Sequence, residues 1–181
     1  MKKLTIGLAV ATCFLAACNS KTTPAVGGDS TAIKTEKNRL TALKSVQNFA
    51  DKKIDSLFAI CAADFVDYGN GEDKPMKNRD SIKTMLNAFF TAFPDYKLSN
   101  LTAFAHGDSA IVTSTATGTF KNAMMGMKPT GKSFKYDDAD IFTFNKDGKM
   151  TSHRSIQSTA TFFSQLGVAP PPPPAAPKDK K

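Results

Sequence analysis

Cysteine and histidine are scarce in this sequence, which has three cysteines and two histidines among 181 residues. The histidines, His106 and His153, are far apart, and neither has the closely spaced partners that a zinc site requires. The phosphate-binding glycine loops and the G-x-S-x-G turn of serine hydrolases are also absent. We therefore predict neither a bound metal nor a cofactor.

Basic residues outnumber acidic ones, and the formal net charge is +8. Much of that excess lies at the ends of the chain, in Lys2, Lys3 and the final KDKK (178–181). No dense Lys/Arg stripe remains between them, so the sequence predicts no nucleic-acid partner.

The N-terminus is typical of a secretion signal: Lys2 and Lys3 precede an apolar run over 4–14. This apolar run is shorter than a membrane-spanning helix, which needs about 20 residues. The following Leu-Ala-Ala-Cys (15–18) resembles a bacterial lipoprotein processing site. This site predicts a signal peptide over 1–17 and an acylated Cys18 as the mature N-terminus. The lipid would anchor the protein in the bacterial cell envelope. We expect the anchor in the outer membrane, with the protein facing the periplasm or the exterior. The alternative is an ordinary cleavable signal.

A single globular domain is expected over 35–168. Residues 18–34 are small and polar with Pro and Gly, which is typical of a flexible tether, and 169–181 form a proline-rich tail that we expect to be a disordered spacer. Only Cys61 stays unmodified in the mature chain, so no internal disulfide can form and the core must stabilise the fold.

The apolar periodicity changes along this domain. Helical spacing is seen over 40–58, as one helix or two, and over 82–93, with Asn78 or Asp80 as cap. After Pro94 the period becomes two, which predicts two hairpins with turns at 106–108 and 145–148. A short helix ending at Gly167 follows. Helices followed by long strands indicate an α+β fold, in which a curved antiparallel sheet wraps around the N-terminal helices as a cone.

Several segments resemble the SnoaL-like, polyketide cyclase-like branch of the nuclear transport factor 2-like superfamily. They are AFPDYKLSN (92–100), HGDSAIVTSTATGTF (106–120), KPTGKSFKYDDADIFTFNKDGKM (128–150) and FFSQLG (162–167). The resemblance implies a cystatin-like α+β cone with a pocket inside and a homodimer through the convex sheet face.

The family's cyclases have Glu-His-Trp after the second hairpin, then three residues and an Asp that acts as acid and base. In GKMTSHRSIQS (148–158), His153 matches the His, Arg154 replaces the Trp and Ser158 replaces the Asp. A serine hydroxyl is no general base near neutral pH without an activating partner. The resemblance thus implies a pocket wall at 154, 156 and 158 from which the family's catalytic group is absent.

Other residues can carry chemistry or bind a ligand. By alternation along the predicted strand, one face carries Tyr136, Asp138, Asp140 and Phe142. If this face is turned into an apolar cone, the two carboxylates would have raised pKa values and could exchange protons. The alternative is that the two carboxylates face water. The candidate catalytic residues are therefore Asp138 and Asp140. The candidate ligand-binding residues are Arg154, Ser158, Tyr136, Phe142 and Tyr68. By alternation with Arg154, His153 is expected on the outer sheet surface.

Three functions are consistent with the sequence. The first is an envelope lipoprotein whose cone binds a small, mostly apolar molecule without family-type catalysis. The second is a cyclase, isomerase or hydratase that uses Asp138 or Asp140. The third is a non-catalytic dimerisation domain.

Overall fold

The computed structural model describes residues 30–71 and 74–169. The predicted signal peptide, Cys18, most of the tether and all but the first residue of the proline-rich tail lie outside this range. Helices come first, as α1 (Ser30–Ala50) and α2 (Ile54–Ala59), and strand β1 (Cys61–Asp67) and helix α3 (Arg79–Ala92) follow. The long strands and the final helix come after them, so the predicted α+β class is confirmed.

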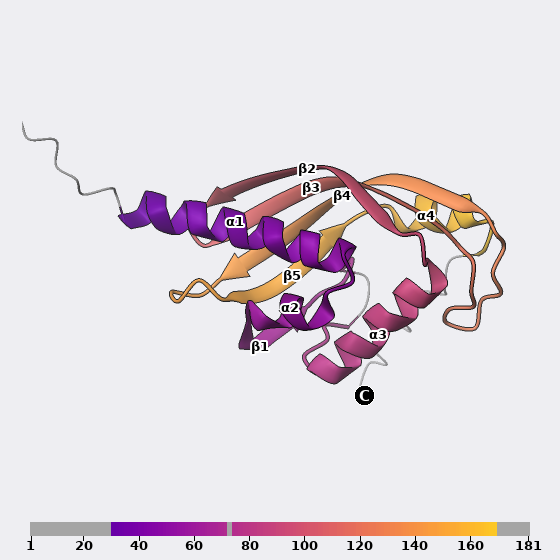
Figure 1. Ribbon diagram of the computed structural model, residues 1–181, viewed down its shortest axis with the longest axis horizontal. Helices are drawn as coiled ribbons and strands as arrows, with labels where there is room; N and C mark the ends of the chain where they lie inside the picture. Colours follow the sequence, from indigo (N-terminus) through magenta and orange to yellow (C-terminus); the bar gives the residue numbers. More distant parts are fainter. Residues whose placement is uncertain (1–29, 72–73, 170–181) are drawn as a thin grey trace, which may run out of the picture.

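One five-stranded sheet forms the body of the domain, in the order β1-β5-β4-β3-β2. Strands β2 (Lys97–His106), β3 (Ser109–Thr119), β4 (Ser133–Phe144) and β5 (Met150–Ile156) pair antiparallel, as both predicted hairpins require. The first strand departs from the expected antiparallel sheet, because β1 pairs with β5 in parallel. The sheet is curved and does not close into a barrel, and α1, α2 and α3 lie on the same side of it (Figure 1).

Helix α1 lies against β2, β3 and β4 and buries an unusually polar stripe, in which Asn38, Ser45 and Asn48 accompany Ala42 and Val46. Leu40, which the periodicity places in the core, is 50% exposed. The helix begins at Ser30, so residues 30–34, expected in the tether, are helical. In the described part of the chain, no helix combines the length and apolar character that crossing a membrane requires.

Helix α3 begins where the sequence predicts, since the Asn78 side chain accepts a hydrogen bond from the Ser81 amide. On its apolar face Ile82, Leu86 and Phe90 are buried, whereas Met85 is 42% exposed. Beyond the helix, Phe93 is inaccessible to solvent and packs against the rings of a cluster from three other segments: Phe120, Phe134 and Phe162. The last of these belongs to α4 (Thr159–Leu166), which ends at Gly167 in the left-handed conformation, as predicted.

Candidate functional site

A cavity of about 1300 Å³ lies between the curved sheet and helices α1, α3 and α4. Its walls include Phe49, Phe89 and Phe163, and its rim includes the exposed Met85 and Met125. Ligand pockets commonly have about 300–1000 Å³ and a mostly apolar lining with a few polar groups. This cavity is large enough for a small organic molecule of several rings.

Strand β4 supplies a row of cavity-facing side chains. Alternation along the strand turns Tyr136, Asp138, Asp140 and Phe142 to the same face, and all four line the cavity. Both aspartates therefore point into the cavity, as expected for carboxylates that are turned into the cone.

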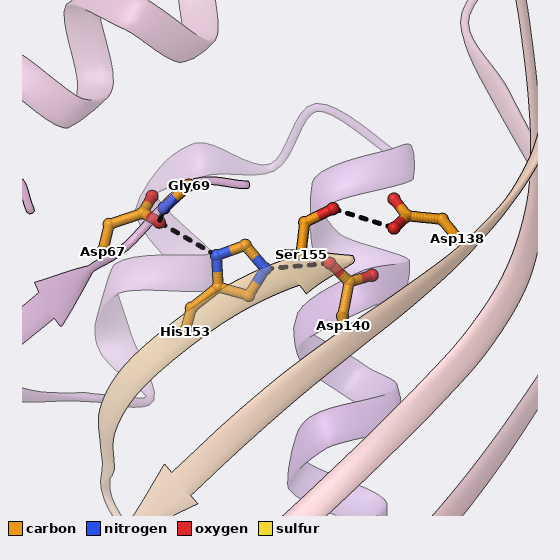
Figure 2. A network of polar contacts seen from close by, with 6 residues as sticks. All are labelled: Asp67, Gly69, Asp138, Asp140, His153 and Ser155. Carbon is orange, nitrogen blue, oxygen red and sulfur yellow. Dashed lines mark hydrogen bonds and ion pairs between the residues drawn. The ribbon is translucent and has the colours of Figure 1, made fainter. Parts of the chain in front are cut away.

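His153 from β5 lies between two carboxylates, as Figure 2 shows. Its Nδ1 is 3.1 Å from Oδ1 of Asp67, and its Nε2 is 2.8 Å from Oδ1 of Asp140. A neutral imidazole has one N–H and would turn a lone pair toward one carboxylate, whereas an imidazolium donates to both. The arrangement therefore favours the charged ring, which also stacks on Phe142 at 5.2 Å between centroids.

The electrostatics of this trio agree with the geometry. Burial alone would lower the pKa of His153, but the hydrogen bonds and negative charges of Asp140 and Asp67 outweigh it and raise the pKa to about 10. Burial works to raise the pKa of Asp67, yet its bonds to His153 and to the Gly69 amide hold that pKa below its usual value. The His153 side chain is thus protonated and positively charged at neutral pH.

Asp138 differs from its neighbour Asp140. Its Oδ1 accepts a hydrogen bond from the Ser155 hydroxyl at 2.8 Å, and no cation contacts it among the described residues. Burial, and then the negative charge of Asp140, raise the pKa of Asp138 to about 6, against the smaller opposing effect of Ser155. A carboxyl group with a pKa near neutrality can both accept and donate a proton.

The prediction that Arg154, Ile156 and Ser158 form the pocket wall on β5 is wrong. His153, Ser155 and Gln157 line the cavity, whereas Arg154, Ile156 and Ser158 lie outside its lining. The expectation that His153 faces the outer sheet surface is corrected by the same observation.

The physical reason is an irregularity in the hairpin. Phe144 pairs with Met150, and both are buried, but the register shifts by one residue before Phe142 pairs with His153. Without that β-bulge, Arg154 would share the face of Asp140. A one-residue shift moves every following side chain to the opposite face.

The remaining predicted residues have structural contacts away from the cavity lining. The Arg154 guanidinium lies over the ring of Tyr68, 5.2 Å from its centroid. The Ser158 hydroxyl caps α4 by accepting a hydrogen bond from the Thr161 amide. Ligand-binding roles for Arg154, Ser158 and Tyr68 thus find no support in the geometry.

Sequence reasoning did not place Asp67 beside His153. The two residues are paired in register by the parallel β1–β5 contact, and the Tyr68 amide donates to the His153 carbonyl at 2.9 Å. No periodicity in the sequence predicts which strand β1 will join, so no local signal identified this carboxylate.

Comparison with protein families finds a match to the model for the SnoaL-like polyketide cyclase over residues 40–166. A comparison with curated proteins finds no match.

Solved structures share the fold at low sequence identity. A SnoaL-like protein from Jannaschia sp. CCS1, described provisionally as a polyketide cyclase, has a TM-score of 0.67 and 18% identity, covering 79% of this chain and 100% of its own. AclR from Streptomyces galilaeus, described provisionally as a hydroxylase, has a TM-score of 0.63 and 23% identity, covering 74% and 97%. A phenazine biosynthesis-related protein from Pseudomonas aeruginosa has a TM-score of 0.61 and 16% identity, covering 82% and 95%. At these identities the likeness concerns the fold.

Proposed function

The chain belongs to the SnoaL-like polyketide cyclase family, whose model matches residues 40–166, and from this premise we propose that it is a membrane-anchored acid–base enzyme of the isomerase or cyclase type. Its cavity binds a small, mostly apolar molecule, and Asp138 moves a proton on that molecule. The observation that carries the proposal is the position of Asp138 inside the cavity with a pKa near neutrality.

Asp138 suits this role better than Asp140. The Oδ1 atom of Asp140 already accepts a hydrogen bond from Nε2 of the His153 imidazolium at 2.8 Å, so this oxygen is engaged within the protein. Asp138 accepts a hydrogen bond from the Ser155 hydroxyl, no cation contacts its carboxyl group among the described residues, and with a pKa of about 6 it can take up and release a proton. In this proposal Asp140, His153 and Asp67 form a fixed charged group beside the reacting carboxyl.

Deuterium exchange tests the proposal without knowledge of the natural substrate. The probe is 2-tetralone, a small bicyclic ketone with acidic C–H groups, followed by proton NMR in D₂O. We expect the protein to accelerate the exchange, with a rate that rises through about pH 6 as Asp138 loses its proton. Asp138→Asn should reduce the exchange to the rate of buffer, whereas Asp64→Asn, a change at an exposed position of β1, should leave it unchanged.

An Asp138→Asn protein that exchanges as fast as the wild type would refute this role. Saturable binding of the ketone with no acceleration by the wild type would instead support the binding module without catalysis. The replacement of the family's usual aspartate by Ser158 is the observation that favours this second candidate.

The proposed anchor is lipid on Cys18 in the bacterial envelope, and the support for it is the order of charged, apolar and small residues before that cysteine. Expressed as the full chain in a bacterial host, the protein should incorporate radiolabelled palmitate and sediment with membranes. Cys18→Ser should prevent both, and unchanged labelling of that variant would rule out this site.

We also propose a homodimer through the outer face of the sheet. Phe104, Ile111 and Ile156 are exposed there, on the face opposite the cavity. Sedimentation equilibrium of the wild type and of Phe104→Ser measures the association, and a wild-type monomer at high concentration would exclude it.

A further inference from the structure

The side of α1 that points away from the sheet carries a stripe of two apolar and two basic side chains. We call it the outer stripe, and it consists of Ile33, Lys37, Leu40 and Lys44. Their spacing of four, three and four residues places them on one side of the helix. Ile33 is 63% exposed and Leu40 is 50% exposed, and both lysines are exposed as well. The other side of α1 is the polar stripe that is buried against the sheet.

A groove of about 420 Å³ lies along the outer stripe. All four residues of the stripe line this groove, and Ile60, directly after α2, adds a third apolar side chain to the lining. Glu36 is the one acidic residue of the lining among the described residues, and Arg39 binds its carboxylate through two hydrogen bonds of 2.7 and 2.8 Å. The groove therefore offers apolar surface with two lysines beside it.

The charge around the groove is positive. Within 30–71 and 74–169, neither Lys37 nor Lys44 takes part in an ion pair. The Lys37 side chain packs against Gly148 in the turn between β4 and β5, and in the same region Lys149 donates a hydrogen bond to the carbonyl of the last residue of α2. Asp147 in this turn offsets one of the three positive charges. The surroundings of the stripe thus favour an anionic partner.

Exposed apolar side chains beside lysines suit a membrane surface. The apolar groups can enter the boundary between headgroups and acyl chains while the lysines reach lipid phosphates. Single apolar residues at a protein surface are common and show nothing by themselves. The place of α1 in the chain adds independent support, because Ser30, its first residue, comes only twelve residues after Cys18.

Twelve residues span at most about 40 Å, so a lipid on Cys18 would keep α1 close to the membrane. Contact between the stripe and the lipid surface then becomes an intramolecular event, for which a weak affinity is sufficient. Of the exposed faces of the domain, that of α1 is therefore held near the bilayer by the shortest connection to the proposed anchor.

We propose that the outer stripe of α1 lies on an anionic lipid surface, with Ile33 and Leu40 among the upper acyl chains and both lysines at lipid phosphates. This inference rests on the lipid anchor on Cys18 proposed above. Helix α1 covers the cavity side of the sheet (Figure 1), so the same orientation turns Phe104 and the proposed dimer face away from the membrane. It also gives a function to the exposure of Leu40.

Tryptophan fluorescence tests this orientation, because the chain contains no tryptophan of its own. The full chain, expressed in a bacterial host and purified with its lipid, is added to vesicles of phosphatidylglycerol and phosphatidylcholine with acyl chains brominated near the headgroup. Bromine quenches tryptophan at close range, so Leu40→Trp should lose most of its fluorescence. Phe104→Trp, at a 60% exposed position on the opposite side of the sheet, is the matched control and should stay bright. Ile33→Trp repeats the test if Leu40→Trp does not fold.

The two lysines are tested in the Leu40→Trp protein. Lys37→Gln and Lys44→Gln should each reduce the ratio of membrane-contacting to free stripe about fivefold, and high salt should weaken the quenching as well. Lys97→Gln with Lys135→Gln removes the same charge from two exposed positions on the outer face of the sheet, and quenching should not change. Vesicles of phosphatidylcholine alone should give less quenching than the anionic mixture.

Sedimentation with the vesicles separates this inference from the proposed anchor. Protein that sediments while Leu40→Trp stays bright, or while Phe104→Trp is quenched equally, overturns the inference and leaves the anchor intact. A blue shift of Leu40→Trp without quenching by bromine would show that protein covers the stripe, which also overturns it. Quenching that depends on neither phosphatidylglycerol nor the lysines would refute the anionic surface. Protein that remains in solution counts against both the anchor and the inference.

Discussion

Replacing His153 by Gln tests the central charge arrangement of the site. Glutamine keeps a comparable size and some hydrogen bonding but has no charge, so Asp67 and Asp140 would be left as two carboxylates without a cation between them. The side chains are 23%, 9% and 14% exposed for His153, Asp67 and Asp140 respectively, so water screens them little. Removal of one partner from a buried ion pair costs about 3–5 kcal/mol, and we expect the free energy of unfolding to fall by about 3 kcal/mol.

The pH dependence gives a second measure of the same contact. The pKa of His153 is about 10 in the folded protein against an ordinary 6.5, so the folded state holds its proton more tightly. Its contribution to stability is fully present below pH 6.5 and is lost as the pH rises through about 10. At about 1.4 kcal/mol per pH unit, the wild type should lose roughly 2 kcal/mol between about pH 7 and pH 8.5. Asp138, with a pKa of about 6, titrates below this interval.

Urea unfolding at these two pH values measures both effects. His153→Gln should be less stable at pH 7 and should lack most of the loss toward pH 8.5. His106→Gln, which changes the other histidine of the chain, should keep the wild-type slope. Equal slopes for the wild type and His153→Gln would refute the assignment of a charged imidazole between the two carboxylates.

Three further changes test packing and local structure. Gly118→Ala would place a methyl group 2.9 Å from the ring of Phe134, so urea unfolding should show a loss of about 1–3 kcal/mol, and an unchanged midpoint would contradict this packing. Asn78→Ala removes the cap of α3 and should cost about 1 kcal/mol in the same assay, with no loss if the cap is unimportant. Burial raises the pKa of the Cys61 thiol to about 12, so maleimide should label it far more slowly in the native protein than in urea; equal rates would show that the thiol is accessible.

Much of the fold could be predicted because its signals are local. Helical spacing and the Asn78 cap located α3, and a glycine turn residue with alternating apolar residues located both hairpins. Leu40 is the exception on α1, where periodicity alone did not show that polar Asn38 and Ser45 would take the buried face instead.

The candidate site was predicted only in part. The alternation of β4 identified Asp138, Asp140, Tyr136 and Phe142 as one face, and all of them line the cavity. The face of β5 depended on a bulge, which leaves no clear mark in the sequence, and the approach of Asp67 depended on a long-range parallel pairing. Non-local pairing and register decided the residues that sequence reasoning misplaced.

Ser158 stands at the position where the resemblance to the family's cyclases implies an acid–base aspartate. Ser158 caps α4 from outside the cavity lining, and aspartate caps a helix about as well as serine and interacts favourably with the helix N-terminus. Ser158→Asp should therefore change the free energy of unfolding by less than about 0.5 kcal/mol and leave the deuterium exchange of 2-tetralone as in the wild type. If the substitution instead raised the exchange rate in Asp138→Asn, residue 158 would reach the bound ketone, and the register of β5 derived from its bulge would be wrong.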